Sequence, residues 1–347
     1  MQKFILKSIV FVSPFIILYL ILPCFYAIDQ GDLFRTGYFQ REDDYRVQFQ
    51  RDFQKPLYYQ AISSIDTCKK SNYSVLVIGD SFSEMDNISY ANYLGENDSI
   101  SVLFYDVRVK LLSDSPVEIL YALVNGDFFD EFSIDYVVLE SVERAFINRA
   151  NRNLNNQVLV KDIVQVEKRQ PKKLKKNVQL NNAIIKYFVA AVLRKYIEGS
   201  VFGVYCFKST KPVFTSKHEN DILVFFMDIK SLPLNSEFTE VSKLNDVLNH
   251  LSGLVDEKGS KLIVLPAPDK YTVYYDYIIN KDKYPQPVFC DILKSLEKHY
   301  IYIKSDEILK NAVSSGITDV YFADDTHWSP VGAKLIAEAI RSAIKQQ

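Results

Sequence analysis

The stretch SVLVIGDSFS, residues 74–83, runs from an apolar segment directly into a turn that contains glycine, aspartate and serine. An unbroken run of valine, leucine and isoleucine is typical of a strand buried on both faces of a parallel sheet. In open α/β sheets, ligands bind at the carboxyl ends of the strands, where this turn would lie. Gly79 lets the turn pass, and Asp80 and Ser83 can cap the turn that follows. Ser81 is therefore a candidate nucleophile; the alternative is a turn that only caps a helix.

The rest of the chain continues this alternation of strands and helices. Further strands are predicted at residues 100–105, 134–139, 261–265 and 299–303, and helices at 117–124, 241–255 and 330–344. Buried strands interleaved with helices predict an α/β fold, a three-layer sandwich around a central, mostly parallel sheet. The ends of several of these strands, like that of residues 74–78, are then expected at one edge of the sheet.

A second polar motif, DTHWSP at residues 325–330, precedes the C-terminal helix. A histidine that acts as general base needs a carboxylate to fix its tautomer and stabilise the imidazolium. Asp325 lies two residues before His327, and Asp324 three before, so either can reach one ring nitrogen while the other nitrogen faces Ser81. A surface histidine in a helix-start loop is the alternative. The order and positions of the two motifs favour one catalytic site.

The N-terminus carries a targeting segment. Residues 8–27, SIVFVSPFIILYLILPCFYA, contain no charge and are long enough to cross a hydrocarbon core as a helix. Lys3 and Lys7 precede them, which predicts a cytoplasmic N-terminus and a domain outside the cytoplasm. We therefore expect residues 1–27 to be an uncleaved anchor, single-pass in the inner (cytoplasmic) membrane. A cleaved signal peptide is the alternative.

Two further regions differ in composition from the predicted domain at residues 73–347. Residues 28–72 are expected to be a connector with one or two helices within 44–61. Residues from about 145 to 217 are expected to be a helical insert with a basic run at 168–176 and an apolar helix face within 184–197. This insert either docks on the domain with a solvated loop, or contacts the membrane or an anionic glycan.

Charge and cysteine usage exclude other classes of protein. The 347 residues include 41 Lys and Arg against 43 Asp and Glu, and a net charge of −2 gives no indication of a nucleic-acid partner. The 4 cysteines form no C-x-x-C or Cys/His spacing, so neither a metal site nor a disulfide framework is expected.

The two motifs together resemble the SGNH (GDSL-like) superfamily. More narrowly, strand-G-D-S-x-S followed by D-x-H-W-S-x-x-G-A resembles the alginate O-acetyltransferase-like and D-H-H-W-like branches, which attach or remove acetyl groups on extracytoplasmic polysaccharides. VVLESVER at residues 137–144 is similar to a strand of that branch that ends in a carboxylate and a Glu-Arg pair. LPAPDK at 265–270, with Tyr274, resembles its Pro-x-x-x-Lys-plus-Tyr segment. The resemblance spans residues 73–347 without the insert.

The sequence also departs from the superfamily at the expected oxyanion site. Ordinary members have a glycine after the second strand and a G-x-N-D block after the third, whereas here residues 105–108 read YDVR and the third strand runs into Glu140 and Ser141. Arg144 and Tyr105 are therefore candidates to complete the oxyanion hole; for Arg144 the alternative is an ion pair with Glu140 or Glu143. Further candidates for oxyanion or substrate contacts are Asp80, Lys270 and Trp328. In some members of the alginate branch the D-T-H-W element precedes the serine, so the resemblance does not specify alginate.

The resemblance implies a membrane-anchored O-acetyltransferase whose catalytic domain is extracytoplasmic (periplasmic). Ser81 would carry the acetyl group to a polysaccharide hydroxyl, with His327 as base and Asp325 as its orienting carboxylate. Such a scheme needs no metal or cofactor, and the acetyl donor would come from a membrane-bound O-acyltransferase. The alternatives are a glycan O-acetyl esterase with the same three residues, and a catalytically silent scaffold that binds glycan or organises an export complex.

Overall fold

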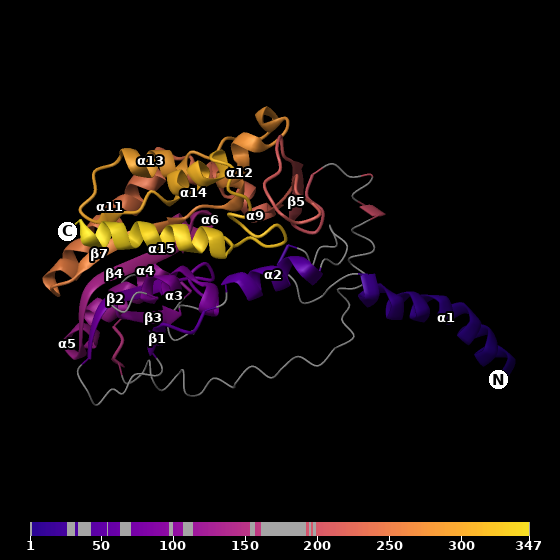
Figure 1. The fold of residues 1–347 in the computed structure, drawn as a ribbon, viewed down its shortest axis with the longest axis horizontal. Helices are drawn as coiled ribbons and strands as arrows, with labels where there is room; N and C mark the ends of the chain where they lie inside the picture. The colour runs from indigo at the N-terminus through magenta and orange to yellow at the C-terminus, as the bar shows by residue number, and fades with distance from the viewer. Residues whose placement is uncertain are drawn as a thin grey trace.

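A six-stranded parallel sheet lies at the centre of the molecule, with helices on both faces (Figure 1). The computed structural model describes residues 2–25, 32–33, 43–53, 55–62, 71–96, 100–106, 114–152, 157–160, 192–193, 196 and 199–346. The strand order is β1-β3-β2-β4-β7-β8, and each neighbouring pair is parallel. The strands are β1 Tyr59–Ala61, β2 Ser71–Gly79, β3 Val102–Asp106, β4 Phe132–Val142, β7 Lys261–Ala267 and β8 Ile301–Tyr302.

Alternate residues of the central strands feed two separate cores. Val75 and Val77 of β2 point into one apolar cluster, and Leu76 and Ile78 into the other; all four are fully buried. This burial on both faces is why the strand is continuously apolar instead of alternating. The predicted α/β fold with a mostly parallel sheet is thereby confirmed.

The helices divide between the two faces. The first core holds residues of α3 Tyr90–Gly95, α12 Lys270–Tyr274, α14 Ser305–Ser314 and α15 Pro330–Lys345. The second holds residues of α4 Pro116–Asn125, α5 Phe128–Glu131, α6 Glu143–Ala150, α11 Phe238–Glu257 and α13 Phe289–Ser295. Shorter elements are α9 Phe226–Lys230, α10 Leu232–Asn235, and the 3₁₀ turns Asp86–Ile88, Tyr275–Tyr277 and Lys281–Lys283.

The start of α15 shows how local sequence fixes the position of the histidine motif. The Ser329 hydroxyl accepts a hydrogen bond from the Val331 N–H at 3.0 Å, and Pro330 occupies the first turn, where a missing N–H costs nothing. Gly332 lies against the chain: a Cβ there would meet the Val320 carbonyl oxygen at 2.4 Å. The loop before α15 is therefore held close to the body of the domain.

The described parts of the connector and of the insert contain strands as well as helices. The helix expected within residues 44–61 is α2 Asp43–Phe53. Pro56 follows soon after its end, and a proline disfavours helical conformation in the residue before it, which keeps the helix from continuing. Residues 59–61 instead form β1, an edge strand beside β3. At the end of the expected helical insert, β5 Val204–Lys208 pairs antiparallel with β6 Asp221–Phe225. The basic run and most of the expected helix face lie outside the described residues.

The helix α1, Gln2–Phe25, lies away from the α/β layers (Figure 1). Its segment Gln2–Ile21 has a mean hydropathy of 2.3 and is long enough to cross a membrane. Its apolar side chains are largely exposed; Phe4 and Phe11, for example, are 75% and 73% exposed. A signal sequence and a single membrane anchor both have this character.

Candidate active site

Ser81 lies in a tight turn directly after β2. The Asp80 carbonyl accepts hydrogen bonds from the N–H groups of Ser83 and Glu84, and the Asp80 side chain accepts one from the Phe82 N–H at 3.0 Å. The Ser81 N–H has no acceptor among the residues that the structure describes. The turn thus presents both the hydroxyl and the backbone N–H of Ser81 at the carboxyl edge of the sheet.

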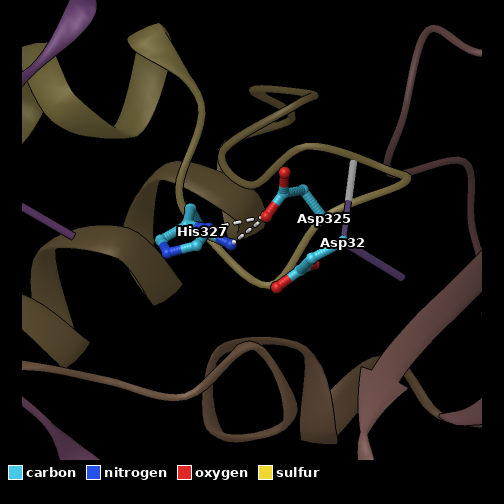
Figure 2. Close-up of side chains that lie close together, drawn as sticks. All are labelled: Asp32, Asp325 and His327. Carbon is cyan, nitrogen blue, oxygen red and sulfur yellow. Dashed lines mark hydrogen bonds and ion pairs between the residues drawn. The ribbon is translucent and has the colours of Figure 1, made fainter. Parts of the chain in front are cut away.

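A hydrogen-bonded chain joins Ser81 to the histidine motif 246 residues later. His327 Nε2 lies 2.8 Å from Ser81 Oγ. On the other side of the ring, His327 Nδ1 lies 2.6 Å from Asp325 Oδ1, as Figure 2 shows. With Nδ1–H donated to Asp325, Nε2 is free to accept the proton of the Ser81 hydroxyl. Of the two aspartates considered from the sequence, Asp325 makes this contact. This is the arrangement of a nucleophile, a general base and an orienting carboxylate.

The electrostatic surroundings tune the basicity of His327. Burial alone would lower the pKa of His327, but the charge of Asp325, its hydrogen bond and the charge of Asp32 raise the pKa above its ordinary value. The Phe82 ring packs on the imidazole with a centroid separation of 4.7 Å. The side chain of His327 remains 18% exposed, so a small substrate can reach the imidazole.

A buried network of hydrogen bonds and one ion pair holds the serine turn in place. Arg149 of α6 pairs with Asp80 and donates a hydrogen bond to Ser141 Oγ at 2.8 Å, while the Val142 N–H donates to Asp80 Oδ2 at 3.1 Å. Burial opposes ionisation of Asp80, but the charge of Arg149 and these donors hold the pKa of Asp80 below its ordinary value. Asp80 is 4% exposed, and its side chain caps the turn, which is one of the roles expected for it from the sequence.

Glu140 supports the same turn from β4. Its Oε2 accepts the Asp80 N–H and the Ser83 hydroxyl, each at 2.8 Å. Burial, followed by the charge of Asp80, raises the pKa of Glu140 well above its ordinary value and favours the neutral acid. The carboxylate expected at the end of the third strand thus faces the backbone of the turn.

The loop that carries His327 is held by Lys270 and Trp328. The buried Lys270 ammonium donates to the carbonyl oxygens of Phe322, Ala323 and Asp325, at 2.7, 3.0 and 3.2 Å. Trp328 is fully buried, and its Nε1–H donates to the Phe82 carbonyl at 3.1 Å, which ties the histidine loop to the serine turn. Both side chains are fully buried, and these contacts hold the two loops in position. The oxyanion or substrate contacts expected of Lys270 and Trp328 from the sequence stay a prediction.

Arg144, at the start of α6, is paired with aspartates that the sequence analysis did not identify. Its Nη1 lies 2.5 Å from Asp269 Oδ1 and 3.3 Å from Asp228 Oδ1. The ion pair is therefore made with these two aspartates, and not with Glu140 or Glu143, the partners considered as the alternative from the sequence. The guanidinium carbon lies 5.8 Å from the centroid of the Phe82 ring, beside the serine turn. Tyr105 is buried in the second apolar core at the end of β3.

Several residues at the site were missed from the sequence. Asp32 comes from the connector, Arg149 lies two turns into α6, and Asp228 begins no recognisable motif. Charge provided one usable signal, because a buried aspartate such as Asp80 needs a cationic partner. Only the fold identifies which of the chain's many cations supplies it.

Asp32, Asp325 and His327 lie close enough together that their spacing is compatible with a metal site. Among the described residues, one ligand atom each from Asp32, Asp325 and His327 lies within 4.8 Å of the others (Figure 2). The ring nitrogens already bond to Asp325 and Ser81, and Asp32 bonds to Thr326. These hydrogen bonds are those of a proton-transfer site, and we assign no metal to it.

The parallel sheet and the hydrogen-bonded serine, histidine and aspartate are similar to those of SGNH hydrolase-like domains. Residues 225–347 match the family described as the SGNH hydrolase-like domain of the acetyltransferase AlgX. The matched segment contains Asp325 and His327, whereas Ser81 lies before it. This similarity confirms the resemblance inferred from the two motifs. A search of curated proteins found no match to the chain.

Proposed function

We propose that the protein is a serine-dependent O-acetyltransferase that moves an acetyl group onto a hydroxyl of an extracytoplasmic polysaccharide. The observation that supports this most strongly is the Ser81–His327–Asp325 hydrogen-bonded chain, with separations of 2.8 and 2.6 Å, in a domain similar to that of an acetyltransferase. Such a chain activates a serine hydroxyl for covalent catalysis.

In the first half-reaction, His327 Nε2 removes the proton of Ser81 as Oγ attacks the acetyl carbonyl of the donor. The tetrahedral intermediate then expels the donor's leaving group, which takes that proton from His327. Asp325 stabilises the imidazolium in between, without itself becoming protonated. The product is acetyl-Ser81 and neutral His327.

In the second half-reaction, a sugar hydroxyl attacks acetyl-Ser81. His327 removes the hydroxyl proton and returns it to Ser81 Oγ as the acetyl–serine bond breaks. The acetylated sugar leaves and the enzyme returns to its initial state. Water in place of the sugar would give free acetate by the same steps, which is the esterase alternative.

Negative charge on the former carbonyl oxygen needs hydrogen-bond donors in both half-reactions. The Ser81 N–H, which has no acceptor among the described residues, is the first. Arg144 is the second in this proposal, because its guanidinium lies beside Phe82 and its charge acts on His327. A guanidinium supplies positive charge and fixed N–H geometry together.

The proposal places α1 in the cytoplasmic membrane as a retained anchor. Lys3 and Lys7 at its start favour an N-terminus in the cytoplasm and a domain outside it. An acetyl donor exported by a membrane-bound O-acyltransferase would then reach Ser81 close to the bilayer surface. The acceptor would be a polysaccharide on the same side of the membrane.

The test uses the full-length protein in detergent with an acetyl ester as donor, with and without an acetyl-free oligosaccharide. We expect acetyl-sugar to form with wild type and to be abolished in Ser81→Ala, with the exposed Ser133→Ala as the matched control. Free acetate with no acetyl-sugar would identify an esterase. Glycan binding without turnover would identify a scaffold, and either result would overturn the transferase proposal.

A further inference from the structure

A carboxylate from the connector reaches the loop of the catalytic histidine. Asp32 Oδ1 accepts the Thr326 N–H at 2.9 Å, and Asp32 Oδ2 accepts the Thr326 hydroxyl at 2.7 Å. Thr326 is the residue between Asp325 and His327, and it is 2% exposed. Both oxygens of Asp32 therefore bind the residue that joins the base to its orienting carboxylate. Figure 2 shows the Asp32 side chain beside those of Asp325 and His327.

The neighbouring residue fastens Asp32 in this position. The Leu33 N–H donates to the Asp324 carbonyl at 3.1 Å, so the connector also binds the backbone just before the motif. The Leu33 side chain is 1% exposed and packs with Val204 of β5 and Leu223 of β6. The packing of Leu33 on the two-stranded sheet thus holds Asp32 in place for its hydrogen bonds to Thr326. Asp32 and Thr326 are 294 residues apart in the sequence.

Asp32 also contributes charge. Its negative charge raises the pKa of His327, after the larger effects of burial and Asp325. Burial, followed by the charge of Asp325, raises the pKa of Asp32 itself to about 6, so Asp32 is mostly ionised at neutral pH. Asp32 also acts on Lys270 and on Asp228, and Arg144 opposes its effect on His327.

We propose that Asp32 is a positioning residue for His327, and that residues 32–33 of the connector are therefore a structural part of the active site. Asp32 holds Thr326, and Thr326 fixes the geometry in which His327 meets Ser81. Asp32 thus assists in activating the nucleophile. This inference rests on the proposed acyl-serine function.

The experiment measures the rate of Ser81 acetylation in the full-length protein with a chromogenic acetyl ester, across a range of pH. Asp32→Ala removes both hydrogen bonds and should slow acetylation about ten- to hundred-fold. Asp32→Asn keeps an acceptor for the Thr326 N–H but removes the charge, and should retain more activity. The exposed Asp135→Asn is the matched control and should behave as wild type.

The pH profile separates positioning at the histidine from a general loss of structure. Neutral His327 is the active form, so acetylation rises with pH through the pKa of His327. Because Asp32 raises that pKa, Asp32→Asn should move the rising limb to lower pH. A change that only loosens the fold would lower the rate at every pH without moving the limb.

A double-mutant cycle tests the route through Thr326. Thr326→Val removes the hydroxyl donor, and combined with Asp32→Ala it should slow acetylation by less than the product of the two single effects, because the residues act through one contact. If Asp32→Ala does not fold, Asp32→Asn and Thr326→Val decide. Wild-type rates and an unmoved limb in these variants would overturn the inference, whereas failure of wild type itself to form acetyl-Ser81 would overturn the proposed function.

Discussion

At the scale of single residues, the site depends on how His327 is charged. Its Nδ1 is committed to Asp325, and its Nε2 faces Ser81, so the tautomer is fixed by contacts and not by solvent. Charge from Asp325 and Asp32 outweighs the effect of burial and raises the pKa of His327. The histidine is therefore a stronger base than an isolated imidazole, at the expense of being protonated at mildly acidic pH.

This predicts the pH dependence of acylation. The rate should rise with pH and reach half its maximum above the ordinary histidine pKa of about 6.5. Asp325→Asn removes the charge that raises the pKa of His327 most, so the rising limb of the rate–pH profile should move to lower pH. The maximal acylation rate should fall by about three to four orders of magnitude, because the tautomer of His327 is no longer fixed. Stopped-flow acylation from pH 5 to 9 measures both. An unchanged limb in Asp325→Asn would contradict the assignment.

Arg144 gives a second prediction at this scale. Loss of one preorganised oxyanion donor costs on the order of a hundred- to thousand-fold in rate, so Arg144→Ala should slow formation of acetyl-Ser81 by that factor. Asp269 and Asp228 would lose their cation, so thermal unfolding must be measured alongside. Arg144→Lys keeps the charge and serves as the control for stability. Normal acylation with weakened transfer to the sugar would instead place Arg144 at the acceptor site, and no effect on either step would leave it structural.

At the scale of elements, the serine turn and the histidine loop are held as one unit. Trp328 bonds to the Phe82 carbonyl, and Lys270 gathers three carbonyl groups of the histidine loop. Burial lowers the pKa of Lys270 to about 8, so it is largely charged at neutral pH. The catalytic geometry therefore rests on hydrogen bonds between loops whose residues lie far apart in the chain.

Residue 79, the last of β2, has room for glycine alone. An added Cβ there would meet Ser83 Oγ at 1.9 Å and Glu140 Oε2 at 2.5 Å. Gly79→Ala should therefore destabilise the domain by about 1–3 kcal/mol and lower acylation by displacing Ser81. Gly253→Ala is the matched control, because a Cβ in that turn of α11 meets nothing within 4 Å; it should stabilise by about 0.5–1 kcal/mol. Chemical denaturation of both variants checks this, and an unaffected Gly79→Ala would contradict the packing.

The elements that could be predicted from the sequence are those with a local signal. The strands β2, β3, β4 and β7 carry unbroken apolar runs, and the serine and histidine motifs are short and contiguous. Strand β1 has only three residues, all partly exposed, and carries no such run. The apolar residues of β5 lie within the segment expected to be a helical insert, so this strand is not predicted. The contacts of Asp32 with Thr326 and of Arg149 with Asp80 depend on how distant segments pack, and no spacing in the sequence encodes them.

At the scale of the whole molecule, the distance from membrane to active site is limited by the chain. Seven residue steps separate Phe25, the end of α1, from Asp32, and a fully extended chain covers about 3.3–3.6 Å per step. If α1 is retained as an anchor, Asp32 and the loop it holds lie within roughly 25 Å of the end of the membrane helix. That placement favours a donor delivered at the bilayer surface.

Retention of the anchor is itself a prediction. The mature protein should begin at or near Met1 and stay with membranes through an alkaline wash, because α1 has the length and hydropathy to span the bilayer. N-terminal sequencing and fractionation measure this. A soluble protein that begins just after Ala27 would show that α1 is a cleaved signal sequence, and the reach of the connector would then set no limit on the site.

The central claim is that Ser81 carries the acetyl group, and a trapped intermediate tests it most directly. The full-length protein is mixed with an acetyl ester in the absence of glycan and quenched in acid, and its peptides are then analysed by mass spectrometry. We predict one added acetyl group on Ser81, absent from Ser83, lost on addition of the acceptor oligosaccharide and missing in His327→Ala. Turnover without an acetyl group on Ser81, or equal turnover in Ser81→Ala, would contradict the account.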